Sequence, residues 1–250
     1  MECDCPTFDA LSKNDGVSDL SINDRKTELR AERDQLILNI ATQLIQAEGL
    51  AGLNMQRIAD QTRYSKGTIY QHYASKEDIV AALVIQCGRR LLDLLTIASE
   101  QPGSIRCKVG LISAAFFINA ATNVSVVALV PTVKSPTFMQ KVSPEHARFL
   151  TDIDDQILQH IVDIFAQDKN FIHISPLQAA FGWWAMQWGT QDVMGKGWDL
   201  ARLGIKNPML YYYQSLQIYL DGLGVEKDVV WQDWSTTLTA AQAIFKASLN

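Results

Sequence analysis

The chain has 250 residues, of which 48% are hydrophobic and 20% are charged, so its composition is ordinary for a globular protein with more than one core. Its formal net charge of −5 excludes a chain that is basic throughout, but the charge is unevenly distributed. Residues 25–76 carry eight Lys or Arg and five acidic side chains, whereas residues 1–24 and 77–250 both have an acidic excess. The segment 25–76 is therefore the part of the chain best suited to face phosphate groups.

Four cysteines are present, and their spacing does not match that of metal ligands: Cys3, Cys5, Cys87 and Cys107. The N-terminus is acidic and lacks an apolar run, which argues against a signal peptide and favours a reducing cytoplasm. Cys3 and Cys5 could form a redox or metal clip, or they could be an incidental pair in a disordered tail. We expect neither a metal nor a cofactor.

Two stretches run for more than twenty residues without a formal charge, Val109–Val133 and Asn170–Gln191, which is long enough for a membrane span. Both contain proline and several uncharged polar side chains. Buried helices of a bundle explain this composition better than membrane spans do, so we expect no membrane partner.

Residues 1–24 are polar and acidic and show no periodic apolar positions, which predicts a flexible leader. The first helix is expected from near Thr27, with apolar residues at helical spacing at Leu36, Ile37, Ile40, Ala41, Leu44 and Ile45. Gly49 follows them and can adopt the left-handed conformation that ends a helix.

Three residues with good N-cap side chains come next. Asn54 predicts a short second helix, Ser65 predicts a third that reaches Tyr73, and Ser75 predicts a long fourth helix that runs to about Ser99. Three short elements therefore lead into one long helix.

Beyond residue 103 the apolar spacing and the Pro, Gly and Asn signals predict helices near 104–122, 124–133, 144–168, 176–194, 208–222 and 233–248. Strand alternation does not persist anywhere in the chain. We therefore expect an all-α protein, with a three-helix N-terminal domain over residues 25–76 and a larger helical C-terminal domain over residues 77–250.

The predicted helices at 176–194 and 208–222 are rich in aromatic residues and Met: Phe181, Trp183, Trp184, Met186, Trp188, Tyr211, Tyr212, Tyr213 and Tyr219. One face of a monomeric helix cannot hide so many large side chains. The pattern predicts a dimer interface, a ligand pocket, or both.

The segment Ile58–Tyr73 has the pattern of a helix-turn-helix, in which a short helix positions a second one across a tight turn. In that motif the second helix enters the major groove, so Lys66, Thr68 and Gln71 would face base edges and Gly67 would let the backbone approach closely. A surface turn between two short helices would show the same periodicity.

The whole block resembles the DNA-binding domain of the TetR family of regulators over roughly residues 30–80. The matching features are a glycine that ends the first helix, an Ile-Ala pair, a Ser-x-Gly-x-x-Tyr-x-x-aromatic helix and a Ser-Lys-Glu start: Gly49, Ile58-Ala59, Ser65-Lys66-Gly67-Thr68-Ile69-Tyr70-Gln71-His72-Tyr73 and Ser75-Lys76-Glu77. Two departures lie in the turn, where Arg63 replaces the usual glycine and Tyr64 replaces a small aliphatic residue. An arginine there must take or avoid a left-handed conformation at a small cost.

The resemblance implies a role for each residue of the motif. Tyr70 and Lys76 resemble phosphate ligands, Thr68 resembles a residue that touches phosphate or base, and His72 is a phosphate ligand or a packed cap. Lys66, Gly67 and Gln71 resemble residues that read bases. The expected DNA contacts are Arg63, Tyr64, Ser65, Lys66, Gly67, Thr68, Tyr70, Gln71, His72 and Lys76.

The resemblance also implies a homodimer that binds double-stranded operator DNA, with the last two long helices forming a four-helix bundle with those of the partner. It further implies a C-terminal effector site and a repressor that a small molecule releases. The aromatic composition favours a small apolar or aromatic effector, with candidate pocket residues Phe116, Phe117, Asn119, Trp183, Met186 and Gln187.

Rival functions have weaker sequence support. Gly189–Gly197 lacks the spacing and the Ser or Thr of a phosphate loop, and His160 with Asp163 forms at most half of a metal site. We expect no catalytic residue, since a triad is not recognisable. A helical adaptor that keeps the fold and binds a protein instead of DNA remains the alternative.

Overall fold

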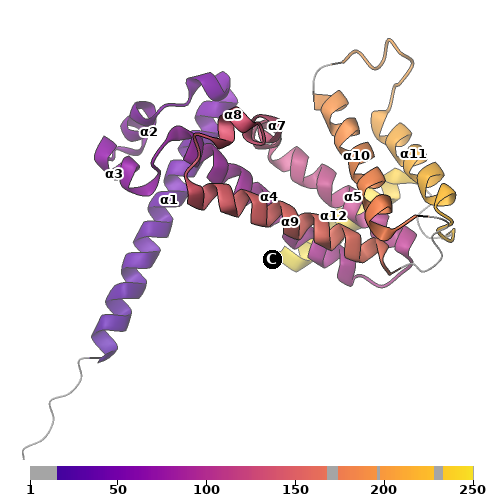
Figure 1. The fold of residues 1–250 in the computed structure, drawn as a ribbon, viewed down its shortest axis with the longest axis horizontal. Helices are drawn as coiled ribbons and strands as arrows, with labels where there is room; N and C mark the ends of the chain where they lie inside the picture. The colour runs from indigo at the N-terminus through magenta and orange to yellow at the C-terminus, as the bar shows by residue number, and fades with distance from the viewer. Residues whose placement is uncertain (1–15, 168–173, 196–197, 228–232, 250) are drawn as a thin grey trace, which may run out of the picture.

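The computed structural model describes residues 16–167, 174–195, 198–227 and 233–249, and these residues form helices joined by turns, without a strand (Figure 1). The all-α prediction is confirmed. Residues 1–15, with Cys3 and Cys5, lie outside the described residues, as does His173.

The first helix, α1 (Gly16–Gly52), begins well before the expected start near Thr27, so the prediction of a leader without regular structure is wrong for residues 16–24. No proline interrupts residues 16–52, and a helix that has been started gains one hydrogen bond for each residue it adds. Figure 1 shows the early part of α1 extending away from the rest of the protein. Gly49 has φ 68° and ψ −170°, so it breaks the helix where the sequence predicted.

The next three helices begin at the predicted caps: α2 (Met55–Thr62), α3 (Lys66–His72) and α4 (Lys76–Glu100). Asn54 Oδ1 accepts a hydrogen bond from Arg57 N at 2.9 Å, Ser65 Oγ from Thr68 N at 3.0 Å, and Ser75 Oγ from Asp78 N at 3.0 Å. Each cap satisfies a backbone N–H that the first turn leaves free, which fixes where each helix starts.

Five later helices lie where the sequence predicted them: α5 (Ile105–Thr122), α9 (Pro144–Phe165), α10 (Pro176–Gly195), α11 (Pro208–Gly222) and α12 (Trp234–Leu249). The prediction of one helix over 124–133 is wrong, because this segment forms α6 (Val124–Val127) and α7 (Val130–Val133). Pro131 lacks an N–H and favours a helix start, so it begins a new turn here. The short α8 (Pro136–Met139) was not predicted.

Two hydrophobic clusters form the core, and α4 contributes to both of them. The first cluster joins α1–α3 and the early part of α4 to side chains from α6 to α9, including Val126, Val133, Phe138 and Leu150. The second cluster lies among the later part of α4 and α5, α9, α10, α11 and α12. The core under the N-terminal helices therefore continues past residue 76.

Among the described residues, α5 is the one helix long and apolar enough to cross a membrane by length and composition. Within the protein, 61% of its residues are buried, so α5 is also what a core helix of this fold would look like.

Candidate nucleic-acid interface and ligand cavity

A groove of about 400 Å³ lies where the start of α2, the helix α3 and the start of α4 meet. Lys66, Tyr70 and Lys76, three of the expected DNA contacts, line it together with Asn54, Met55, Gln56, Ala74, Ser75 and Glu77. Tyr70 is 48% exposed, and the Lys66 ammonium lies 5.9 Å from the centre of its ring. The groove thus combines two ammonium groups, a phenol and the positive N-terminal ends of α2 and α4, which suits a phosphate.

The outer face of α3 is open to a partner. Lys66, Gly67, Tyr70 and Gln71 are exposed. A Cβ added at Gly67 would meet only Ser65 Oγ, at an ordinary 3.6 Å, so the fold of this chain does not require a glycine there. The absence of a side chain at Gly67 instead leaves room for something outside the chain to approach the backbone.

The turn before α3 has an unusual backbone. Arg63 has φ 59° and ψ 23°, so it takes the left-handed conformation that its sequence position suggested. Its side chain is exposed, as is that of Ser65. Ser65 Oγ also lies 2.8 Å from Thr68 Oγ1, so the Thr68 hydroxyl is engaged in the helix cap.

Two of the expected DNA contacts point inward. Tyr64 is half-buried and packs against the first hydrophobic cluster. The side chain of His72 is only 7% exposed, and its Nδ1 lies 2.5 Å from Asp34 Oδ1 of α1. For His72 the structure favours the packed cap over the phosphate ligand.

The N-terminus of α4 is tied to the start of α9 by a cluster that we call the Asp78 junction, formed by Ser75, Asp78, Ser143 and His146. The carboxylate of Asp78 is 1% exposed, and its Oδ1 accepts a hydrogen bond from Ser143 N at 2.8 Å. Ser75 Oγ donates to Asp78 Oδ2 at 3.2 Å, and His146 Nδ1 lies 3.3 Å from Asp78 Oδ1. Because Ser143 is the N-cap of α9, a movement of α9 reaches α4 and the adjoining α3 through this junction.

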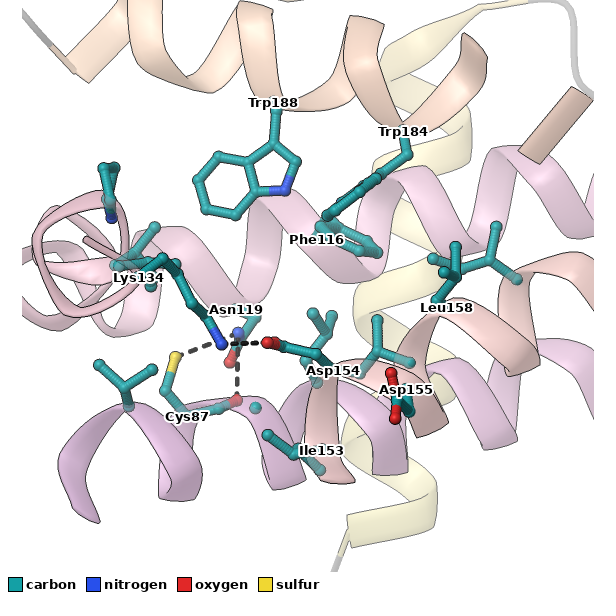
Figure 2. Close-up of a pocket in the computed structure, with 18 residues that line it drawn as sticks. Cys87, Phe116, Asn119, Lys134, Ile153, Asp154, Asp155, Leu158, Trp184 and Trp188 are labelled. Atoms are coloured by element: carbon teal, nitrogen blue, oxygen red, sulfur yellow. Dashed lines mark hydrogen bonds and ion pairs between the residues drawn. The ribbon is translucent and has the colours of Figure 1, made fainter. Parts of the chain in front are cut away.

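A second hollow, of about 430 Å³, lies in the C-terminal part of the protein between α4, α5, α7, α9 and α10 (Figure 2). The side chains of Trp184 and Trp188 extend from α10 and border one side of the hollow, with Phe116 of α5 beside Trp184. Aliphatic side chains complete most of the wall: Val84, Leu91, Val127, Val130, Ile153, Ile157, Leu158 and Ile161. The volume and the mainly apolar lining are those of a small-molecule site.

A few polar groups interrupt this apolar wall. Asn119 Nδ2 lies 3.4 Å from Cys87 O and 3.3 Å from Cys87 Sγ, and burial raises the pKa of the Cys87 thiol. Lys134 of the α7–α8 connection forms an ion pair with Asp154 of α9, drawn as a dashed line in Figure 2. Asp155 also lines the hollow. Among the described residues, groups of three or more His, Cys, Asp or Glu placed to hold a metal are absent.

Of the six expected pocket residues, Phe116 and Asn119 line this cavity and the other four do not. Trp183 is fully buried, with its Nε1 donating to Ser113 Oγ at 3.0 Å, and the buried Gln187 accepts from the Tyr212 hydroxyl at 2.5 Å. Phe117 packs on Tyr212 at 5.0 Å between ring centres, and Met186 packs against the second hydrophobic cluster.

Trp184 and Trp188 line the cavity but were not among the predicted pocket residues, although their aromatic segment was expected to form a pocket or an interface. They are four residues apart and so share one face of α10, as do Trp183 and Gln187 on another face. Because α10 is apolar on all sides, periodicity alone does not indicate which pair faces the cavity.

Exposed apolar side chains gather on α10 and α11. Leu177 and Phe181 of α10 and Tyr211 and Ile218 of α11 are all exposed, Ile218 by 73%. The two helices approach closely, because a Cβ at Gly182 would lie 2.6 Å from the hydroxyl oxygen of Tyr219. The described residues of α12 present no exposed large apolar side chain, so the exposed apolar surface lies on α10 and α11 rather than on α11 and α12.

Comparison with known proteins agrees with this architecture. Residues 37–83, from the middle of α1 into α4, match the family model for bacterial regulatory proteins of the tetR family. No curated protein sequence matches the chain.

Several solved structures have a similar fold. A bacterial regulatory protein in the tetR family from Rhodococcus RHA1 has a TM-score of 0.58 and 18% identity, covering 78% of this chain and 98% of its own. The TetR family transcriptional regulator PfmR from Thermus thermophilus has a TM-score of 0.54 and 17% identity, covering 77% and 99%. FadR from Bacillus subtilis, solved in complex with stearoyl-CoA, has a TM-score of 0.55 and 18% identity, covering 75% and 98%. At such identities the likeness establishes the fold.

Proposed function

Because the chain belongs to the TetR family of transcriptional regulators, we propose that it is a cytoplasmic repressor that binds operator DNA as a homodimer and leaves it when a small molecule occupies the cavity. The observation that carries the DNA-binding part is the groove lined by Lys66, Tyr70 and Lys76, next to an exposed α3 whose Gly67 leaves the backbone approachable. Tyr70 and Lys76 hold phosphates, while Lys66 and Gln71 reach bases: lysine can pair with guanine and glutamine with adenine.

The exposed apolar surface of α10 and α11 supports the dimer. Phe181 and Ile218 are large apolar side chains that a monomer exposes to water, which is unfavourable. Burying them against the same surface of a second copy would remove this unfavourable exposure. A dimer places two copies of α3 on one face, and the two half-sites are read about one helical turn of DNA, roughly 34 Å, apart.

The route from cavity to DNA runs through α4 and α9. Residues of both helices line the cavity, and they pack so closely that a Cβ at Gly88 would lie 3.0 Å from Ile153 Cγ1. A ligand that separates α4 from α9 moves the Asp78 junction and with it α3. It thereby favours a spacing of the two recognition helices that no longer fits the operator.

Salt-titrated binding of the full chain to its own promoter DNA and to a scrambled duplex tests this proposal. We expect selective binding to the promoter, and its loss in the double variant Lys66→Ala, Tyr70→Ala. Removing the phosphate ligand Lys76 from both protomers, in a separate Lys76→Ala variant, should flatten the slope of log K against log salt concentration by about 2. Lys206→Ala is the matched control, since this exposed lysine lies far along the chain from α3 and should leave promoter binding unchanged.

Equal, weak binding to both duplexes, unaffected by the double variant, would contradict DNA reading and favour the protein-binding adaptor. Selective binding by a protein that remains monomeric on DNA would contradict the dimer alone.

A further inference from the structure

The charges around the cavity point to the chemistry of its occupant, given the proposed function. We propose that the effector is an amphiphilic cation, a molecule with an apolar or aromatic body and a single positive charge. The body lies against Trp184, Trp188 and Phe116, and the charged group lies at the α9 side with Asp154 and Asp155.

The formal charge of the cavity wall is negative. Three charged residues line it, Lys134, Asp154 and Asp155, and the first two neutralise each other as an ion pair. Asp155 borders the hollow and is exposed to solvent, and among the described residues its side chain has no ion pair or hydrogen bond. One carboxylate without a cation therefore lies where a mainly apolar wall meets solvent, and its field attracts a positive group to that side of the hollow.

The aromatic side of the cavity favours the same charge. Trp184 and Trp188 lie one turn apart on α10 and both border the hollow, with Phe116 close by (Figure 2). The face of an aromatic ring is negative, and among the aromatic side chains tryptophan attracts a cation most strongly. Both sides of the cavity thus select a positive ligand, although they are built by different helices.

The cavity wall offers little that would bind an anionic effector. Within the described part of the wall the only cation is Lys134, which Asp154 already neutralises, and Asp155 lies beside that pair in the sequence. The amide of Asn119 does not supply a free donor, because its Nδ2 faces Cys87 and its Oδ1 accepts from Asn123 Nδ2 at 3.2 Å. Arg90 influences the Cys87 thiol electrostatically, but its side chain is exposed and does not line the cavity.

The test is calorimetric titration of the full-length protein with three probes of similar size that differ in charge: phenylbutyl-trimethylammonium, phenylpentanol and phenylpentanoate. We expect the ammonium probe to bind about tenfold or more tightly than the alcohol, and the carboxylate to bind most weakly. Asp155→Asn should remove most of the preference for the cation and leave the affinity for the alcohol unchanged. Trp184→Leu should also lower the preference.

Asp152→Asn is the matched control, because Asp152 is an exposed carboxylate of the same helix that does not line the cavity. It should leave all three affinities unchanged. Tighter or equal binding of the alcohol or the carboxylate, or no binding of the ammonium probe, would overturn the assignment of a cationic effector.

Promoter release measured with the same probes separates this inference from the proposed function. If the alcohol or the carboxylate binds best and releases the DNA, control by an effector stands and the cationic class fails. If the cation binds with the expected preference and the DNA stays bound, the class holds for the cavity and release by the effector fails.

Discussion

The groove beside α3 and the cavity beneath α10 are of similar volume but are built in opposite ways. The groove is lined by residues between Asn54 and Glu77, so one short stretch of chain supplies all of it. The cavity takes its wall from Val84 through Trp188 and needs α4, α5, α7, α9 and α10 to be packed together. Local hydrogen bonds at helix caps shape the first, and contacts between distant helices shape the second.

The groove and the cavity therefore depend on different kinds of interaction. Three caps and one turn shape the groove, while the cavity takes its wall from residues of both hydrophobic clusters. Substitutions that remove one kind of support and leave the other therefore test the contrast.

Trp183→Ala should have the largest effect. This side chain is fully buried, packs edge-on against Phe116 at 5.4 Å and donates to Ser113, so its loss should lower the free energy of unfolding by about 3–5 kcal/mol. Trp188→Ala is the control, since it enlarges an existing hollow and should cost much less. Denaturant unfolding at a fixed protein concentration measures both. Equal losses would mean that the cavity wall supports the fold as strongly as the cluster behind it.

The same contrast explains how much the sequence could predict. Asn54, Ser65 and Ser75 predict where their helices begin, because a cap acts within three residues. The roles proposed for Lys66, Tyr70 and Lys76 at those helix starts come from the resemblance and stay predictions. The sequence left two positions open for His72, a phosphate ligand or a packed cap, because its partner Asp34 lies on another helix.

The cavity was predictable only in outline. Phe116 and Asn119 were identified, but Trp183 was chosen where Trp184 borders the hollow. Trp183 and Trp184 are neighbours on an apolar helix, so the orientation of α10 about its axis decides which of them faces the cavity. That orientation is set by hydrogen bonds that involve Ser113 and Tyr212 on other helices. The division of residues 124–133 into two helices was missed because the effect of Pro131 depends on how the chain continues around it.

Asp78→Ala should have the next largest effect, because it acts where the two regions meet. The substitution leaves Ser143 N without its charged acceptor, which should cost about 2 kcal/mol of stability. Asp78→Asn keeps an acceptor oxygen and should cost less. The decisive measurement is the ligand concentration that releases promoter DNA: we expect the alanine variant to bind the ligand normally and to release DNA poorly. Unaltered release would mean that the cavity communicates with α3 by another route.

Arg63→Gly should have the smallest effect. It should raise the stability of the protein and lower its affinity for promoter DNA. Glycine adopts a φ of 59° without the steric cost that arginine bears, so the free energy of unfolding should rise by about 1 kcal/mol. Promoter affinity should fall at the same time, with a flatter salt dependence, if the exposed guanidinium holds a phosphate. Arg63→Ala, which loses the charge and keeps the strain, should lose affinity without gaining stability. Together the two variants separate the effect of the backbone conformation from the effect of the side chain. A glycine variant that is more stable and binds DNA as well as the original chain would leave the strain at Arg63 without a function. Weaker binding by the glycine variant would show that the strained backbone is kept because the arginine side chain contacts DNA.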